Sequence, residues 1–437
     1  MVKSMVSGNI LKSGVSEERF NLIGISGQNT SYSITKETIE DAARQLKGIV
    51  KRTPMVESFW LNSKIKGQVY LKLENIQVTG SFKPRGAYIK LNSLTPDERS
   101  KGVIAMSASN HAQGVAYNAQ KMGIPATIVM PENTPISKVE STRHYGASVI
   151  LHGNTIIESR DFAMQLIKKH GYTMVHPFDD PCIIAGQGTI GLEMLADVPD
   201  LDVLIVPVGG GGLAAGICIA AKAINPKIQI IGVQSAACQS MAEILFPNTV
   251  VQTCLRSDQT IADGIAVKYP GTLNLSILKD HLDDFLIVEE HFIETAIERL
   301  VVHNKIVVEG AGAIGVAAIL STPGIFQGRK VGTIIGGGNI DSRVLSNLLL
   351  RGMVQNGKLV RFKIQIDDAP GILGHLTQII GKAGGNIFEI SHQRLFNNIA
   401  TKTAYLDAVV ETRNCEHAIT ICQSLMSGGF QTEIMEE

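Results

Sequence analysis

The sequence has little of what would assign it to a nucleic-acid-binding or disulfide-stabilised class. Its 437 residues carry a formal net charge of zero, with 40 basic and 40 acidic side chains, and no basic patch stands out along the chain. This balance argues against a nucleic-acid partner. The six cysteines include no C-x-x-C pair and are too sparse for a disulfide framework. They are expected to be small apolar residues of a reduced, cytoplasmic protein.

Long uninterrupted apolar runs are also scarce. The uncharged stretch 203–221 approaches the length of a membrane span, but Pro207 and four consecutive glycines interrupt it. Because each glycine costs ~1 kcal/mol relative to alanine inside a helix, a strand, a glycine turn and a buried helix fit this stretch better. The N-terminus has Lys3 and Lys12 but no long apolar core typical of a signal peptide. We therefore expect no membrane partner.

The chain is long enough for two or three domains. Residues 1–33 are polar and unpatterned, and we expect an N-terminal extension there. Residues 34–350 alternate apolar strand-like runs with helical stretches, as in "GVIAMSA" followed by "NHAQGVAYNAQKMG". Such alternation predicts an α/β fold with two doubly wound, mostly parallel-sheet subdomains and helices on both faces, the smaller subdomain spanning about 82–185.

The pattern changes in residues 351–437. A strand with alternating apolar residues covers Val360 to Ile366, and a helix is expected to begin at Pro370. Strands near 386–392 and 401–412, a helix over 415–426 and a strand over 430–435 complete a βαββαβ order, which predicts a ferredoxin-like domain. An RNA-recognition role is disfavoured because the strands lack aromatic RNA-contact motifs.

The stretch "TGSFKPRGA" holds one lysine, Lys83, between Phe82 and Pro84. A residue before proline is biased toward extended geometry, so Lys83 is predicted to be extended and outside a helix. A lysine in partly apolar surroundings can have a lowered pKa and form a Schiff base with a carbonyl. An ordinary exposed loop lysine is the alternative that the stretch by itself leaves open.

A glycine turn follows the strand "VLIVPV" and precedes a helix, with the sequence Gly209, Gly210, Gly211, Gly212 and Leu213. Successive backbone N–H groups of such a turn can converge on an anion at the positive end of the helix. No Lys or Thr follows as in a Walker loop, and the G-x-G-x-x-G pattern is absent. The turn therefore favours a small phosphate group, with a purely structural tight turn as the alternative.

A second strand end carries the polar sequence "SASNH", which includes Ser107, Asn110 and His111. These residues can cap a helix or donate hydrogen bonds to a carboxylate or phenolate oxygen. A third strand end carries Gly336 in "GGGNID", with "EGAGA" upstream. A phosphate cradle, a loop lysine and no metal-ligand cluster together indicate a pyridoxal-phosphate site with Lys83 as its lysine.

Seven motifs then occur in a characteristic order: "SFKPRGA", "SASNHAQG", "AGQGTIGLEM", "GGGGLAAG", "ADGIAV", "EGAGA" and "GGGNID". Over 34–350 the chain resembles the threonine dehydratases (threonine ammonia-lyases), pyridoxal-phosphate enzymes of the tryptophan-synthase-β type. The tail from about 359, with "DDAPGIL", resembles an ACT domain, a regulatory module that binds amino acids.

This resemblance implies roles for individual residues. Lys83 is expected to form the Schiff base with pyridoxal 5′-phosphate, with Phe82 beside the cofactor ring. Asn110 is expected to hydrogen-bond the phenolic oxygen of the ring, and Gly209, Gly210, Gly211, Gly212 and Leu213 to bind the phosphate. Ser107, Asn110 and His111 are expected to receive the substrate carboxylate.

The resemblance also implies an activity and its regulation. L-Threonine would give 2-oxobutanoate and ammonia, and L-serine would give pyruvate as a secondary activity. Isoleucine or valine would act at the ACT domain of a homodimer or homotetramer in isoleucine biosynthesis. A serine dehydratase or racemase and a catalytically silent amino-acid-binding regulator are the alternatives.

The sequence departs from the family pattern at four places. Gly336 stands where the family has Ser, Thr or Cys to bond the pyridine nitrogen, and Ser109 stands where glycine is usual. The stretch "GVQSAACQS" lacks the carboxylates with which serine racemases bind a cation, so no metal site is expected. Ala108 replaces the second acid/base serine of the racemases, which weighs against racemisation.

Overall fold

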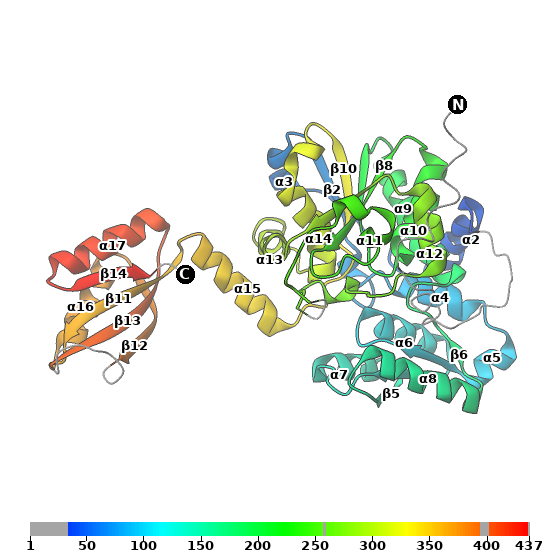
Figure 1. Ribbon diagram of the computed structural model, residues 1–437, viewed down its shortest axis with the longest axis horizontal. Helices are drawn as coiled ribbons and strands as arrows, with labels where there is room; N and C mark the ends of the chain where they lie inside the picture. Colours follow the sequence, from blue (N-terminus) through cyan, green and yellow to red (C-terminus); the bar gives the residue numbers. More distant parts are fainter. Residues whose placement is uncertain (1–33, 257–258, 394–401, 436–437) are drawn as a thin grey trace. The chain divides into compact units, whose positions relative to one another are not determined.

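The structure is a computed structural model that describes residues 34–256, 259–393 and 402–435. The described residues form two compact units (Figure 1). The larger unit comprises the described residues up to 296 and Val307–Asn339, and the smaller unit comprises Ile297–Ile306 and the described residues from 340 onward. The predicted N-terminal extension at 1–33 lies outside the described residues.

The larger unit is built around a six-stranded sheet in the order β1-β2-β10-β7-β8-β9. All neighbouring strands in it are parallel except the edge pair β1 and β2. Its central strand β7 reads "VLIVP" and is buried at every position, as expected for a parallel strand covered on both faces. The strands are β1 (Met55–Glu57), β2 (Gln68–Lys72), β7 (Val203–Pro207), β8 (Gln229–Ser235), β9 (Asp284–Val288) and β10 (Lys330–Ile334).

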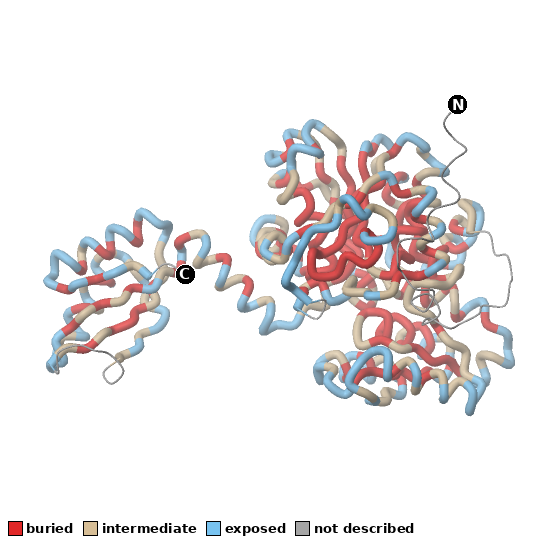
Figure 2. Tube along the Cα trace, viewed as in Figure 1, coloured by how far each residue is buried: buried red, intermediate tan, exposed pale blue. Residues whose placement is uncertain are grey.

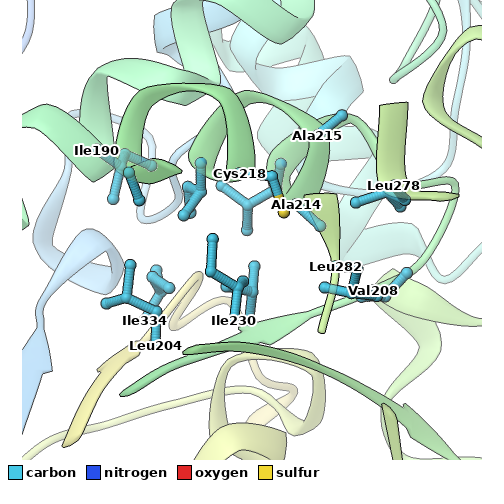
Figure 3. Close-up of a cluster of buried hydrophobic side chains, with 14 of the residues drawn as sticks. Ile190, Leu204, Val208, Ala214, Ala215, Cys218, Ile230, Leu278, Leu282 and Ile334 are labelled. Carbon is cyan, nitrogen blue, oxygen red and sulfur yellow. The ribbon is translucent and has the colours of Figure 1, made fainter. Parts of the chain in front are cut away.

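Helices cover both faces of this sheet. The helices α9 (Pro181–Asp197), α10 (Gly212–Ile224) and α12 (Thr272–His281) share a core with one face, whereas α14 (Gly310–Ser321) packs on β7, β8, β9 and β10. Figure 3 shows Ile190 and Cys218 pointing from the helices toward Leu204 and Ile230 of the sheet. The remaining helices of this part are α2 (Lys36–Leu46), α3 (Phe59–Ile65), α11 (Ala242–Leu245) and α13 (Glu290–Arg299).

A second sheet in the larger unit has four parallel strands in the order β5-β4-β3-β6. The helices α4 (Pro84–Asn92) and α6 (Asn110–Met122) cover one face and α8 (Ile156–His170) packs on the strands from the other. Two parallel sheets, each with helices on both faces, confirm the predicted α/β class. The other elements are β3 (Val103–Met106), β4 (Ala126–Met130), β5 (Ser148–Leu151), β6 (Thr173–Met174), α5 (Pro96–Lys101) and α7 (Ile136–His144).

A buried cluster of charges anchors the start of α4. The fully buried Arg85 pairs at 2.7 Å with Glu74 and at 2.7 Å with Glu193, and the buried Lys72 pairs at 2.6 Å with the other oxygen of Glu193. The two cations and two anions balance, so no charge in the cluster is left uncompensated. The cluster ties α4 to β2 and α9, two residues beyond Lys83.

The backbone of Lys83 differs from the sequence prediction. The residue has φ −56° and ψ −33°, a right-handed helical conformation, and it is the N-cap of α4 with Pro84 at the first helical position. The Arg85 N–H donates to the Phe82 carbonyl at 3.1 Å, and the Ala87 N–H donates to the Lys83 carbonyl at 3.2 Å. These turn bonds, together with the buried position of Arg85, outweigh the local preference imposed by Pro84.

The smaller unit consists of a helix, α15 (Ser342–Gln355), and an antiparallel sheet in the order β12-β13-β11-β14. The helices α16 (Ile372–Lys382) and α17 (Cys415–Ser427) share one hydrophobic core with β11 and β13, including Phe362 and Ile364 (Figure 2, buried segments in red). The strands are β11 (Leu359–Asp367), β12 (Asn386–Gln393), β13 (Thr403–Glu411) and β14 (Gln431–Met435).

The starts of α16 and β13 can be compared with the boundaries predicted from the sequence. The helix α16 begins at Ile372, not at Pro370, because Gly371 precedes it as the N-cap with φ 90°. Pro370 therefore belongs to the turn before the helix. Position 401, where a strand was predicted to begin, lies outside the described residues, and the strand there begins at Thr403. Within the described stretches, no helix combines the length and apolarity needed to cross a membrane.

The charge cluster yields a stability prediction. Arg85→Leu should lower the free energy of unfolding by about 3–5 kcal/mol, because Glu74 and Glu193 lose their partner inside the protein. The matched control is Lys101→Ala, which removes an exposed pair with Asp97 and should cost no more than about 1 kcal/mol. Urea unfolding measures both variants, and equal losses would contradict a structural role for the buried cluster.

Candidate active site

A cavity of about 720 Å³ opens in the larger unit, among loops that follow strands of both of its sheets. Ligands of open α/β sheets bind at the carboxyl ends of the strands, which is where this cavity lies. All the site residues predicted from the sequence line it, together with Ala108, Ser109 and Gly336. They are Phe82, Lys83, Ser107, Asn110, His111, Gly209, Gly210, Gly211, Gly212 and Leu213.

Lys83 is partly buried in the wall of the cavity. Its Nζ donates to the carbonyl of Pro177 at 2.9 Å and lies 5.2 Å from the centre of the Phe82 ring. Burial lowers the pKa of Lys83 to about 8, and the negative charge of Glu309 only partly opposes this effect. A substantial fraction of the amine is therefore neutral near physiological pH and able to act as a nucleophile or base.

The glycine turn places backbone donors at the start of α10. The carbonyl of Gly210 accepts from Asn274 Nδ2 at 2.9 Å and from the Gly271 N–H at 3.1 Å, so the Gly211 N–H of the same trans peptide points the opposite way. A Cβ at Gly210 would lie 2.4 Å from the Phe178 ring, which only glycine avoids. The arrangement suits an anion bound by main-chain N–H groups at a helix N-terminus.

Asn110 is held by two side chains. Its Nδ2 donates to Glu309 Oε1 at 2.6 Å, and its Oδ1 accepts from Asn339 Nδ2 at 2.7 Å. Because a side-chain amide has two N–H donors, one N–H of Asn110 is left for a further acceptor. The two bonds also fix which way the amide faces.

Glu309 is a cavity residue to which the sequence assigned no role. Burial raises its pKa to about 7, with a further rise from Asp263, whereas the bond from Asn110 acts in the opposite direction. The motif "EGAGA" contains a single glutamate, and the sequence around it gives no spacing signal for a role. The same holds for Asn339 in "GGGNID".

The imidazole of His111 donates one hydrogen bond to the backbone, and its other ring nitrogen has no partner. Its Nε2 lies 2.9 Å from the Val175 carbonyl and therefore carries the proton, which leaves Nδ1 as the acceptor. Burial, and then the charge of Lys83, lower the pKa of His111 to about 3. A neutral ring with no free N–H cannot bind a carboxylate, so only the backbone N–H of His111 could do so.

The rim of the cavity contains an ion pair between α7 and the 3₁₀ turn η4 (Asp263–Ile265). Lys138 Nζ lies 2.6 Å from an oxygen of Asp263, and both residues line the cavity. Among the described residues, no group of three or more His, Cys, Asp or Glu side chains is arranged to hold a metal ion.

The chain is similar to known pyridoxal-phosphate enzymes in sequence and in fold. Residues 46–337, which include all the predicted site residues, match the family described as pyridoxal-phosphate dependent enzymes. The L-threonine ammonia-lyase of Thermotoga maritima is 43% identical over 402 residues, 92% of this chain and 100% of that protein. The catabolic L-threonine dehydratase of Staphylococcus aureus is 46% identical over 74% of this chain and 94% of that protein. The structure of maize serine racemase matches with a TM-score of 0.68 at 33% identity, covering 74% of this chain and 99% of that chain.

The raised pKa of Glu309 predicts a pH-dependent stability. Between its ordinary value of 4.5 and about 7, the folded chain holds a proton that the unfolded chain has released. The stabilisation is therefore complete below pH 4.5 and is lost as the pH rises through about 7. Urea unfolding of the cofactor-free chain should show this loss, of about 3 kcal/mol, and Glu309→Gln should lack it. Identical pH profiles for the two chains would contradict the prediction.

Proposed function

Because this chain belongs to the family of pyridoxal-phosphate-dependent enzymes, we propose that it is a threonine ammonia-lyase, which converts L-threonine to 2-oxobutanoate and ammonia. L-Serine would give pyruvate by the same chemistry. The observation that carries the proposal is the partly buried Lys83 in the same cavity as the main-chain donors at the start of α10. The cofactor is pyridoxal 5′-phosphate.

The residues present fit this cofactor. Lys83 offers an amine of lowered pKa for the aldehyde, and Gly209–Leu213 offer N–H groups for the phosphate. Asn110 has one N–H that would be available for the phenolic oxygen, and Phe82, which lines the cavity, would lie beside the ring. Bound there, the cofactor supplies an electron sink that makes the Cα–H bond of an amino acid acidic.

The chain's own groups then bind and deprotonate the substrate. Ser107 and the backbone N–H groups of Asn110 and His111, at the positive end of α6, receive the substrate carboxylate. The neutral amine of Lys83 accepts the Cα proton. The β-hydroxyl leaves as water with one proton, which balances the proton taken from Cα. Hydrolysis of the remaining enamine consumes one water and gives the oxo acid and ammonia. The enclosing cavity walls limit the access of water during these steps.

Gly336 provides no side chain for the pyridine nitrogen. A Cβ at this position would meet the Phe82 ring at 3.5 Å, an ordinary contact, so crowding does not impose the glycine. When the β-hydroxyl leaves, the electron pair at Cα moves into the new double bond, so this step does not depend on a strongly electron-withdrawing ring. An uncharged ring nitrogen is therefore compatible with the proposed reaction.

Two other functions are less well supported. A racemase needs a second acid/base on the far side of the substrate. At the position where the racemases have a serine for this role, the chain has Ala108, which lines the cavity and cannot transfer a proton. This disfavours racemisation despite the likeness to maize serine racemase. A silent amino-acid-binding protein would have no need of a partly buried lysine with a lowered pKa.

We further propose that the smaller unit is an ACT domain that senses isoleucine or valine. Its β11-α16-β12-β13-α17-β14 order supports this, as does the loop "DDAPGIL" before α16. The match to the Thermotoga relative covers 402 residues, 92% of this chain. The remaining residues are fewer than those of the smaller unit, so the match must extend into this unit. Copies of the module would pair in a homodimer or homotetramer. End-product sensing of this kind would place the enzyme in isoleucine biosynthesis.

The activity is tested with the purified chain and three substrates. L-Threonine should yield 2-oxobutanoate, L-serine should yield pyruvate more slowly, and neither L- nor D-serine should racemise. Lys83→Ala should abolish both turnover and the visible absorption band that arises when the cofactor is joined to the lysine, because the amine is lost. Lys121→Ala, at an exposed lysine of α6, is the matched control. Normal turnover by Lys83→Ala would refute the role of this residue.

The regulatory role is tested by titrating the full-length holoenzyme with isoleucine and valine. One of them should lower the initial rate with threonine, and D-isoleucine should not. Gly371→Val should weaken the response, because it strains the φ of 90° at the start of α16. Gly381→Ala, where an added Cβ meets nothing within 4 Å, is the control. A rate that is unaffected by either amino acid would leave the unit without a sensing role for them.

A further inference from the structure

The two side chains that hold Asn110 come from segments far apart in the sequence. Glu309 begins the segment that leads into α14, and Asn339 ends the loop after β10. Asn339 Nδ2 also donates to the Thr79 carbonyl at 2.9 Å, four residues before Lys83. We name Glu309, Asn110 and Asn339 the amide clamp. It fixes the orientation of one side chain from two independent directions.

The backbone around the clamp is packed too closely to rearrange freely. The Glu309 N–H donates to the Gly337 carbonyl at 3.1 Å, and the Gly338 N–H donates to the Gly80 carbonyl at 2.9 Å. A Cβ at Gly337 would lie 2.2 Å from Glu309 Oε1 and 3.0 Å from Asn110 Nδ2. Glycine at this position therefore allows the carboxylate and the amide to meet.

The chain passes between the two compact units next to both ends of the clamp. It leaves the smaller unit between Ile306 and Val307, two residues before Glu309, and enters it again directly after Asn339. The chain makes one further crossing, between Ala296 and Ile297, which is not next to the clamp in sequence. Two of the three covalent connections of the smaller unit thus end at a residue that holds Asn110, or within two residues of one.

The segment of the smaller unit before the first crossing has an unusual backbone. It contains a π-helical turn, η5 (Leu300–Asn304), followed by Lys305 in the left-handed region with φ 58°. Such turns recur at functional positions and are strained relative to a regular α-helix. Arg299 just before the turn donates to Asn356 at the end of α15, at 2.9 Å.

We propose that Glu309 and Asn339 are positioning residues that orient Asn110 toward the cofactor, and that the smaller unit acts on the active site through them. The proposal rests on the proposed function in one respect, which is that Asn110 faces the bound cofactor. A shift of either connecting segment changes a hydrogen bond to Asn110 without any contact between an effector and the cavity. Asn110 then presents its remaining N–H in a different direction.

The first experiment compares full-length holoenzymes. Glu309→Ala and Asn339→Ala should each shift the absorption maximum of the bound cofactor and speed its dissociation about tenfold, because a buried hydrogen bond to Asn110 is lost. Glu309→Gln should retain both wild-type properties, since its Oε1 still accepts from Asn110. A purely structural role would instead make Glu309→Gln resemble Glu309→Ala or leave the spectrum of Asn339→Ala unchanged. Either result would overturn the proposal.

The second experiment perturbs the smaller unit alone. A Cβ at Gly352 of α15 would lie 2.5 Å from Cγ of Glu298, so Gly352→Ala must displace the Glu298 side chain or move α15 relative to the segment before η5. The variant should shift the cofactor spectrum in the same direction as Asn339→Ala, whereas Gly381→Ala should not. In combination with Glu309→Ala, its effect should be less than additive. A wild-type spectrum for Gly352→Ala would refute transmission through the clamp.

Threonine turnover by the wild-type chain is measured in the same preparations. A chain that binds pyridoxal phosphate but leaves threonine unchanged would contradict the proposed function. The spectra and dissociation rates would still decide whether the clamp orients Asn110, so the two failures are distinguishable.

Discussion

The partial burial of Lys83 in the cavity wall is the constraint on which the rest of the site depends. A charged amine loses solvation when protein surrounds it, and here the neighbouring Glu309 carboxyl restores only part of that loss. Burial is the largest influence on both groups. It lowers the pKa of Lys83 and raises the pKa of Glu309, so it favours the neutral form of each. The amine is thereby available for a carbonyl compound without a metal or a strong base beside it.

This constraint also explains why so much of the site is backbone. Side chains with permanent charge next to Lys83 would change its pKa, whereas main-chain N–H groups bind an anion without adding a net charge. Gly210 and Gly337 are the positions where the packing requires glycine most clearly. At Gly210 it accommodates the Phe178 ring, and at Gly337 it lets Glu309 meet Asn110.

The sequence was most informative where the signal is local. Alternating apolar and amphipathic stretches predicted both parallel sheets, and motifs at strand ends predicted residues that line one cavity. Asn110 and Asn339 are 229 positions apart in the sequence, and neither motif predicts that their side chains form a hydrogen bond. Glu309 was missed for the same reason. The conformation of Lys83 was predicted wrongly because the tertiary bonds of Arg85 override a preference that Pro84 sets locally.

The most direct test of this account is the pKa of Lys83 in the cofactor-free chain. It is measured from the pH dependence of the rate at which an amine-specific reagent modifies Lys83, followed by mass spectrometry of the peptide that contains it. The exposed Lys121 in the same sample is the internal reference. The account predicts a midpoint of about 8 for Lys83. A midpoint near the ordinary value of 10.5 would contradict it.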